Sequence, residues 1–102
     1  MTKEYKNKLG QLHRTDGPAV EYTDGDKEWY INGLRHRTDG PAIEYNDGGK
    51  EWWINGKLHR EDGPAVEYSN GYKSWYLNNI EYTEDQYQHE LSKIKLKRLI
   101  EL

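Results

Sequence analysis

Short runs of alternating hydrophobic and polar residues fill most of the chain, and each run ends at a turn signal. The run PAVEY, at residues 18–22, alternates with a period of two, which predicts a strand. The run KEWYIN, at residues 27–32, has the same period. TDGD stands between them, and Asn32-Gly33 follows the second run; such pairs favour tight reversals because Asn, Asp and Gly tolerate positive φ. The pattern therefore predicts two short strands joined by a hairpin and followed by a second turn.

This pattern recurs every 23 residues. The heptapeptide HRTDGPA occurs at 13–19 and 36–42, and HREDGPA occurs at 59–65. In each copy Gly supplies an unusual backbone dihedral, Pro fixes the next φ, and the Asp side chain is expected to cap its own turn. A unit of this size cannot bury its apolar face alone, so neighbouring units complete it. We therefore predict three stacked units, at residues 12–34, 35–57 and 58–79.

Stacking these units in register predicts two rows of side chains on opposite faces of a sheet. We expect the more apolar row to form the core. The expected core row is Val20, Ile43, Val66, Tyr22, Tyr45, Tyr68, Trp29, Trp52, Trp75, Ile31, Ile54 and Leu77. The expected opposite row is Ala19, Ala42, Ala65, Tyr30, Trp53 and Tyr76. Because a turn comes about every dozen residues, no helix is expected before residue 80.

The two ends of the chain differ from the repeated part. Residues 1–11 are rich in Lys and predict a partial edge strand, since Lys guards edges against further pairing. In residues 80–102, Thr83 followed by Gln86 is a capping-box signature that predicts a helix over about 84–100. We expect this helix to cap the array by folding over the final unit or over the exposed sheet face. Its expected apolar stripe is Tyr87, Leu91 and Ile94, widened by Leu99 and Ile100.

Composition and charge restrict the function. Hydrophobic residues make up 33% of the chain and aromatic residues 13%, with no Phe, which favours a thin sheet with Trp and Tyr ladders over a thick core. The net charge of −3 argues against binding to a phosphate backbone. There is no cysteine, no apolar run long enough for a membrane span and no signal-peptide pattern. We therefore expect a cytoplasmic protein.

The phrases EYTDGDKEWYING and EYNDGGKEWWING, with 23 residues per unit and a Gly-punctuated hairpin, resemble MORN-type repeats. They are most similar to the degenerate MORN-like variants of small bacterial and bacteriophage proteins. The resemblance covers residues 12–79 and implies an elongated antiparallel β-meander. We therefore predict a mainly β fold: a single elongated antiparallel β-meander of three 23-residue hairpin repeats, capped by a C-terminal α-helix.

The His-Arg-x-Asp loops are the candidates for catalysis or metal binding. A His oriented by Asp can act as a general base, but the chain has no Cys and its serines are not repeated. Each unit offers one His, and stacked units place equivalent side chains in a row rather than around an ion. We predict no catalytic residue, metal, cofactor or enzymatic activity; a hydrolase using His13, His36 and His59 is the alternative. We expect Arg14, Arg37 and Arg60 to pair with carboxylates of neighbouring units.

The aromatic residues Tyr30, Trp53 and Tyr76 stand opposite the expected core row. Either the helix covers them as a second small core, or they form an exposed binding stripe, because large exposed aromatic patches mark binding sites. Acidic residues flank them, so a base-stacking platform for nucleic acid is disfavoured. The predicted partner-binding residues are Glu21, Glu28, Tyr30, Glu44, Glu51, Trp53, Glu67 and Tyr76.

These features predict a non-enzymatic protein-binding module. The resemblance implies a small phage-type accessory protein that inhibits a host factor, such as a defence nuclease, in the manner of an anti-CRISPR or anti-restriction protein. Its partner would present a basic nucleic-acid-binding groove, which a row of carboxylates at strand spacing would occupy. A self-assembling scaffold is the alternative, with a homodimer formed through the helix that contains KIKLKR at 93–98. Direct nucleic-acid binding is the less favoured third class.

Overall fold

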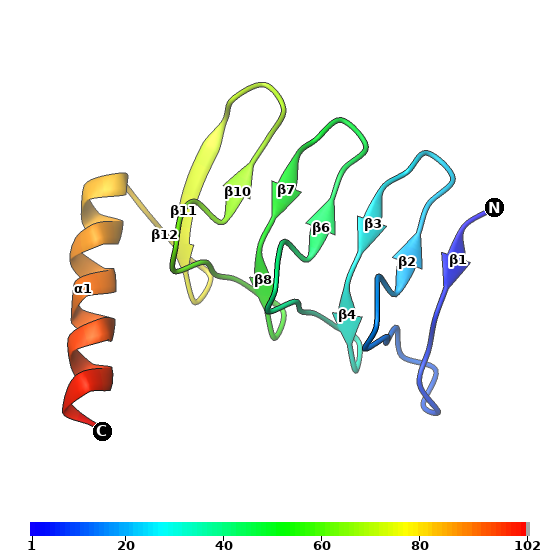
Figure 1. Cartoon of the computed structure of the whole chain (residues 1–102), viewed down its shortest axis with the longest axis horizontal. Helices are drawn as coiled ribbons and strands as arrows, with labels where there is room; N and C mark the ends of the chain where they lie inside the picture. Colours follow the sequence, from blue (N-terminus) through cyan, green and yellow to red (C-terminus); the bar gives the residue numbers. More distant parts are fainter. Residues whose placement is uncertain (102) are drawn as a thin grey trace.

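The computed structural model describes residues 1–101, and it folds as a mostly β antiparallel sheet with a single C-terminal helix (Figure 1). The expected mainly β class and the C-terminal helix are thereby confirmed. The molecule is thin, with extents of 45 × 35 × 18 Å. None of the helical structure within the described residues is long and apolar enough to cross a membrane.

The main sheet consists of eight short antiparallel strands that follow one another in chain order along the molecule. The last two strands are longer than the others and lead into the helix. Within residues 1–79 the described structure contains strands, bridges and turns but no helix, as expected. The strands are β1 (Lys3–Glu4), β2 (Val20–Glu21), β3 (Lys27–Glu28), β6 (Ile43–Glu44), β7 (Lys50–Glu51), β10 (Val66–Glu67), β11 (Lys73–Leu77) and β12 (Ile80–Tyr82).

Two further hairpins leave the main sheet at its lower edge in Figure 1. They are formed by β4 (Tyr30–Ile31) with β5 (Leu34–Arg35), and by β8 (Trp53–Ile54) with β9 (Lys57–Leu58). The turn of the first is Asn32-Gly33, with φ of 49° and 82°. Positive φ at both central residues is the requirement of a type I′ turn, which Asn-Gly satisfies at little cost. The predicted second reversal is therefore confirmed.

The upper hairpin loops, such as residues 22–26, close through a three-residue turn. The amide of Tyr22 donates to the carbonyl of Asp26 (2.9 Å), and the amide of Gly25 donates to the carbonyl of Tyr22 (3.0 Å). Gly25 has a φ of 100°, a left-handed value that favours glycine. The Asp24 carboxylate accepts from the amide of Asp26 (3.0 Å) and fixes the loop from inside.

The register of these hairpins corrects the expected faces. Val20 lies opposite Glu28, and Glu21 lies opposite Lys27. Cross-strand partners point to the same face, so the side of Val20 carries Glu28, while Trp29 belongs to the other side. The expectation that Val20 and Trp29 share a core row is wrong. The reason is the length of the hairpin loop. It pairs residues whose numbers differ by an even number, such as Val20 with Glu28. The expected rows instead combined even-numbered residues of the first strand with odd-numbered residues of the second.

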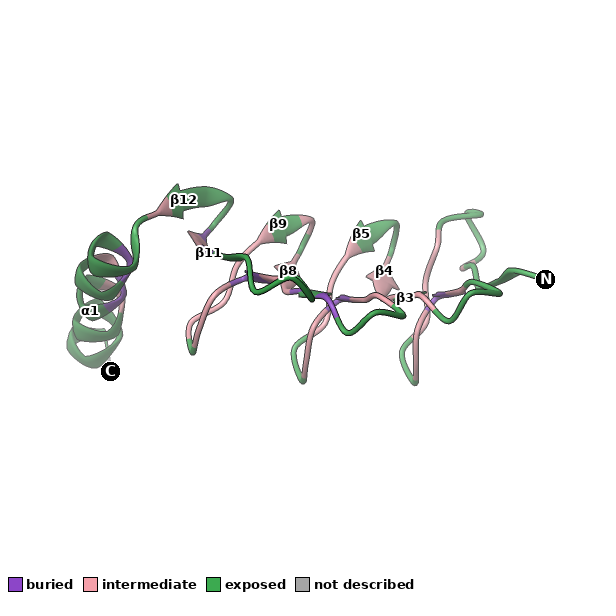
Figure 2. Cartoon of the chain, turned by 90° about the horizontal axis from the view of Figure 1, so that it is seen from above, coloured by how far each residue is buried: buried purple, intermediate pink, exposed green. Residues whose placement is uncertain are grey.

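The most buried residues of the main sheet are small or aliphatic and lie along its middle, while the helix adds Tyr87, which is 1% exposed (Figure 2). The three alanines expected on the open side are fully buried, with 0% of their surface exposed. The backbone of Ala42, for example, donates to the carbonyl of Glu51 and accepts from the amide of Trp29, so it is hydrogen-bonded on both sides. The buried residues of the sheet centre are Ala19, Ala42, Ala65, Val20, Ile43 and Val66.

The first strand forms the free edge of the sheet. β1 pairs with β2 in antiparallel register, and a bridge joins Lys6 to Leu12. The edge strand expected within residues 1–11 is therefore present. Its exposed lysine side chains disfavour pairing with another strand.

Helix α1 (Glu84–Ile100) begins at the predicted capping box. The Thr83 hydroxyl accepts from the amide of Gln86 (3.2 Å), and the Gln86 side chain accepts from the amide of Thr83 (3.1 Å). Tyr87 and Leu91 are buried, which confirms the first part of the predicted stripe. Leu99 and Ile100 are exposed, so the prediction that they widen the stripe is wrong. They lie in the C-terminal turns of the helix, which extend past the packed residues.

The helix covers the end of the sheet, at the third of the 23-residue sequence segments (12–34, 35–57 and 58–79). Its apolar stripe packs on Trp75, Leu77 and Tyr82. The hydroxyl of Tyr87 donates to the carbonyl of Arg60 (2.6 Å) and accepts from the amide of Gly63 (3.3 Å). These contacts place α1 at the end of the sheet, on the side of Trp75 (Figure 1). The alternative left open by the sequence is thereby decided: the helix does not cover the row of Tyr30, Trp53 and Tyr76.

Candidate functional site

The eight predicted partner-binding residues lie on two opposite faces. We call the side with Glu28 and Glu51 the carboxylate face, and the side with Arg14, Arg37 and Arg60 the arginine face. The structure brings together Glu28, Glu51, Tyr30, Trp53 and Tyr76 on the carboxylate face. It places Glu21, Glu44 and Glu67 on the arginine face. The expectation of one shared acidic surface is therefore wrong, because the hairpin register separates the two sets.

On the arginine face the same contacts recur in each copy of the heptapeptide. We call these copies, residues 13–19, 36–42 and 59–65, the corners. The guanidinium carbon of Arg37 lies 3.9 Å from the ring centroid of Trp29. Its Nε donates to Asp39 (3.0 Å), and its Nη1 donates to the carbonyl of Pro41 (3.0 Å) and to Glu44 (2.9 Å). A Cβ at Gly40 would stand 3.0 Å from the guanidinium carbon, so glycine makes room for the stacked arginine. The guanidinium of Arg37 thus links its own corner to the strand that carries Glu44 and to Trp29 of the preceding segment.

Arg14 and Arg60 make the corresponding contacts in the other two corners. Their rings are those of Tyr5 (4.0 Å) and Trp52 (3.6 Å). The corner aspartates accept from these arginines rather than capping their own turns, which corrects the expected role of Asp. The arginines pair with carboxylates of their own segment and stack on a ring of the preceding one, which corrects the expected pairing as well. The ion pairs are Arg14 with Asp16 and Glu21, Arg37 with Asp39 and Glu44, and Arg60 with Asp62 and Glu67.

Each repeated histidine holds a turn of its own segment. The Nδ1 of His36 accepts from the amide of Asn55 at 3.0 Å, which requires that nitrogen to be unprotonated. His13 and His59 accept in the same way from the amides of Asn32 and Asn78. Among the described residues, no three His, Cys, Asp or Glu side chains come together as a metal site. The heptapeptide therefore recurs because each copy builds the same corner and supports the same turn.

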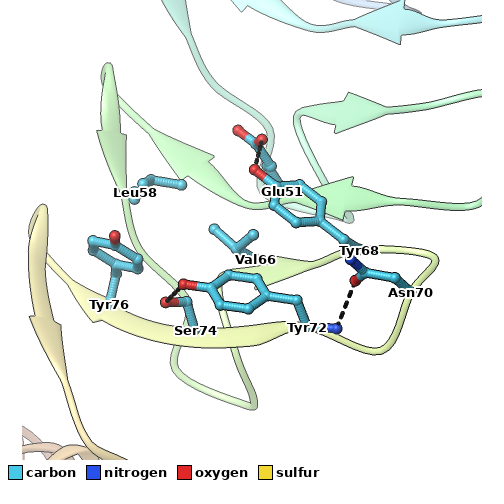
Figure 3. A pocket seen from close by; sticks show the side chains of 8 residues that line it. All are labelled: Glu51, Leu58, Val66, Tyr68, Asn70, Tyr72, Ser74 and Tyr76. Carbon is cyan, nitrogen blue, oxygen red and sulfur yellow. Dashed lines mark hydrogen bonds between the residues drawn. The ribbon is translucent and has the colours of Figure 1, made fainter.

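The carboxylate face is organised around Glu51, of which only 8% is exposed (Figure 3). Its Oε2 accepts from the hydroxyls of Tyr45 (2.8 Å) and Tyr68 (3.0 Å), and its Oε1 accepts from the indole N–H of Trp53 (2.9 Å). Burial and the hydrogen bond to this carboxylate raise the pKa of Tyr45 well above its ordinary value. Three neutral donors thus hold a buried carboxylate in place of an ion pair.

Glu28 is the corresponding carboxylate one segment earlier, and it has an additional cationic neighbour. It accepts from the hydroxyls of Tyr30 (2.6 Å) and Tyr22 (3.2 Å). Burial, followed by the hydrogen bond to Glu28, raises the pKa of Tyr30 to about 12. Nη2 of Arg35 lies 3.6 Å from Oε1 of Glu28. Sequence reasoning missed Arg35; its signal was that it replaces the Leu found at the matching positions of the other two segments.

A hollow of about 440 Å³ opens on the carboxylate face beside the third segment. Its walls are tyrosine rings, and its floor includes Val66 and Leu58 (Figure 3). At one side the hydroxyl group of Ser74 lies 3.1 Å from that of Tyr72 and donates to Glu81 (2.6 Å). The lining residues are Glu51, Leu58, Val66, Tyr68, Asn70, Tyr72, Ser74 and Tyr76.

The two faces therefore offer different chemistry. On the arginine face each charged corner group is engaged by a group of opposite charge, which leaves little free binding capacity. The carboxylate face presents aromatic rings next to two carboxylates, of which Glu28 is paired with Arg35 and Glu51 has only neutral donors. Such an arrangement attracts cations. Comparison of the chain with known protein families, curated proteins and solved structures finds no match. The function must therefore be inferred from this geometry.

Proposed function

We propose that the protein is a non-enzymatic module that binds another protein through its carboxylate face. The observation that supports this most is that α1 packs on the side of Trp75 and leaves the row of Tyr30, Trp53 and Tyr76 uncovered. Trp and Tyr are the side chains that most often anchor protein interfaces. Further tyrosines widen the row and are 39–50% exposed: Tyr22, Tyr68 and Tyr72.

The scaffold under this face is proposed to be an array of three 23-residue, MORN-like hairpin repeats. Support comes from contacts that recur at this spacing, such as those of Arg14, Arg37 and Arg60 with their aspartates. Each segment contributes one aromatic residue to the row at the same position. A rigid array of this kind presents its side chains at fixed distances, which lowers the conformational entropy lost on binding.

The specific form of the proposal is a small phage-type accessory protein that acts in the cytoplasm of a bacterial host. It would inhibit a host factor with a basic groove, such as a defence nuclease, as anti-CRISPR and anti-restriction proteins do. The face that meets the partner carries Glu28, Glu51 and Glu81, so charge complementarity is local rather than a continuous row along the sheet. Nucleic acid itself is disfavoured as the ligand because Arg14, Arg37 and Arg60 lie on the other face in ion pairs, and Arg35 on this face is paired with Glu28.

Capture from a bacterial lysate tests the proposal. Immobilised wild-type protein is expected to retain a basic protein. Tyr72→Lys places a cation on the carboxylate face at a half-exposed position and should abolish capture through like-charge repulsion. Lys73→Ala is the matched control, since Lys73 pairs across from Glu67 on the arginine face and its loss should leave capture intact. Equal capture by both variants, or none by the wild type, would contradict the proposal.

Self-association through α1 is a second candidate. It is favoured by three apolar side chains on the C-terminal half of the helix that are 60–77% exposed: Leu96, Leu99 and Ile100. Sedimentation velocity at rising protein concentration should then show a dimer that Leu99→Lys removes. A monomer over the whole range would exclude this candidate.

A further inference from the structure

The chain contains its own example of a cation bound on the carboxylate face. Arg35 lies directly across from Tyr30 in the β4–β5 hairpin. Its guanidinium carbon is 5.6 Å from the ring centroid of Tyr30 and 5.2 Å from that of Trp53. Its Nη2 is 3.6 Å from the carboxylate of Glu28. A guanidinium is therefore seated between the aromatic residues of two successive segments and beside the carboxylate of the first.

One segment later the same surroundings exist without the cation. Leu58 lies across from Trp53, as Arg35 lies across from Tyr30. The matching carboxylate is Glu51, and the next aromatic residue of the row is Tyr76. Here the hollow of about 440 Å³ is found, and its lining contains a carboxylate but no Lys or Arg. Where the chain has Arg35, its guanidinium fills the space between the aromatic rings. Where it has Leu58 at the matching position, the space is an open hollow.

The carboxylate of Glu51 retains capacity for one more donor. A carboxylate offers about four acceptor positions, and three are occupied by Tyr45, Tyr68 and Trp53. The remaining position is on Oε1, which has a single donor. A second carboxylate, that of Glu81, is held near the hollow by Ser74. A cation entering the hollow would therefore meet negative charge and aromatic rings, as Arg35 does within the chain.

We propose that this hollow binds the guanidinium of an arginine side chain of the partner protein. The proposal rests on the proposed function and adds the chemistry of the residue that the partner must supply. The guanidinium would donate to Glu51 and lie against the tyrosine rings of the hollow, while its alkyl stem would cover Leu58. An arginine fits better than a lysine because its planar group can stack on a ring and donate to a carboxylate at the same time.

A titration that needs no partner tests this site. N-acetyl-arginine amide is added to the wild-type protein, and the ring protons of Tyr68, Tyr72 and Tyr76 are followed by NMR. Saturable shifts confined to these rings are expected. The uncharged isostere N-acetyl-citrulline amide should cause no saturable shift, and the lysine derivative a weaker one. Equal responses to the arginine and citrulline compounds, or shifts confined to the arginine face, would overturn the proposal.

A substitution in the hollow gives the second arm of the test. Leu58→Arg should fill the site with the chain's own guanidinium, as Arg35 does, and abolish the arginine-dependent shifts. Leu58→Met keeps an apolar side chain of similar volume and should retain them. If Leu58→Arg is not folded, the comparison of arginine with citrulline on the wild type still decides the outcome. Unchanged shifts in a folded Leu58→Arg variant would refute the site.

The same variants separate this inference from the proposed function. If the lysate partner is captured by wild type, Leu58→Met and Leu58→Arg alike, the binding face stands and the arginine site falls. If the arginine compound binds but no protein is captured, the function falls while the hollow keeps its cation selectivity. Loss of capture in Leu58→Arg alone supports both.

Discussion

The arginine face and the carboxylate face are built from the same repeated segment, yet they treat charge in opposite ways. On the arginine face a stacked guanidinium such as Arg37 forms ion pairs with two carboxylates, Asp39 and Glu44. On the carboxylate face the buried Glu51 is held by hydroxyl and indole donors that carry no charge. The first face thus engages its charges with one another, whereas the second leaves Glu51 without a cationic partner at a surface that the helix does not cover.

Removing a corner arginine is expected to have the largest effect on stability. Arg37→Ala deletes the stack on Trp29 and the bonds to Asp39, Glu44 and the carbonyl of Pro41, so we expect a loss of about 2–4 kcal/mol in the free energy of unfolding. Urea unfolding followed by Trp fluorescence measures it. Arg35→Ala, on the opposite face, is the matched control and should cost less. Equal losses would show that the arginines of the two faces have the same role.

Substitution of the corner glycine Gly40 tests the same contact of Arg37 from the other side. Gly40→Ala introduces a Cβ that would stand 3.0 Å from the Arg37 guanidinium carbon, so the stacked arginine must shift. We expect a loss of about 1–2 kcal/mol. In an Arg37→Ala background the same substitution should cost close to nothing, because the group it displaces is gone. Additive losses in the double variant would contradict this reason for the glycine.

The two kinds of carboxylate are expected to respond differently to neutralisation. Glu51→Leu leaves the hydroxyls of Tyr45 and Tyr68 and the indole N–H of Trp53 without their acceptor, and we expect a loss of about 1–3 kcal/mol. Glu67→Leu removes a partly exposed partner of a single arginine and should cost less than about 1 kcal/mol. Thermal unfolding of both variants decides the order, and a reversed order would refute the distinction between the faces.

The contact between α1 and the third corner, from Arg98 to Glu61, should give the smallest effect, which is present at neutral pH and is lost in acid. Bonds from Arg98 and His59 lower the pKa of Glu61 to about 2 from its ordinary 4.5. Because the folded state holds the charged carboxylate, this stabilisation is present above about pH 4.5 and is lost as the pH falls towards 2. Arg98→Ala should therefore weaken the pH dependence of unfolding within that window. An unchanged pH profile would show that the pair contributes nothing.

Much of the local structure could be predicted from the sequence because it depends on neighbouring residues. The capping box at Thr83 and Gln86 and the turn at Asn32-Gly33 are determined within a few positions, and both form as predicted. The faces could not be assigned in this way. They depend on how many residues each hairpin loop contains, and an error of one position moves every side chain of the second strand to the other face.

The candidate site shows the same limit. The aromatic row of Tyr30, Trp53 and Tyr76 was predicted, and the structure leaves it uncovered by the helix. The alanines were assigned to the side opposite the core because they alternate with Val20, Ile43 and Val66 along the chain, yet they are fully buried. Arg35 was overlooked because its importance lies in departing from the repeat rather than in matching it. Deviations between otherwise equivalent segments are therefore as informative as the repeat itself.

The hairpin register divides the side chains into these two faces. Nuclear Overhauser contacts in the free protein test it most directly. The account predicts contacts between the Tyr22 ring and the Glu28 side chain, and between the Trp29 ring and the Arg37 side chain. Contacts of the Trp29 ring with the side chains of Val20 and Tyr22 would contradict it, since they would place all three residues on one face.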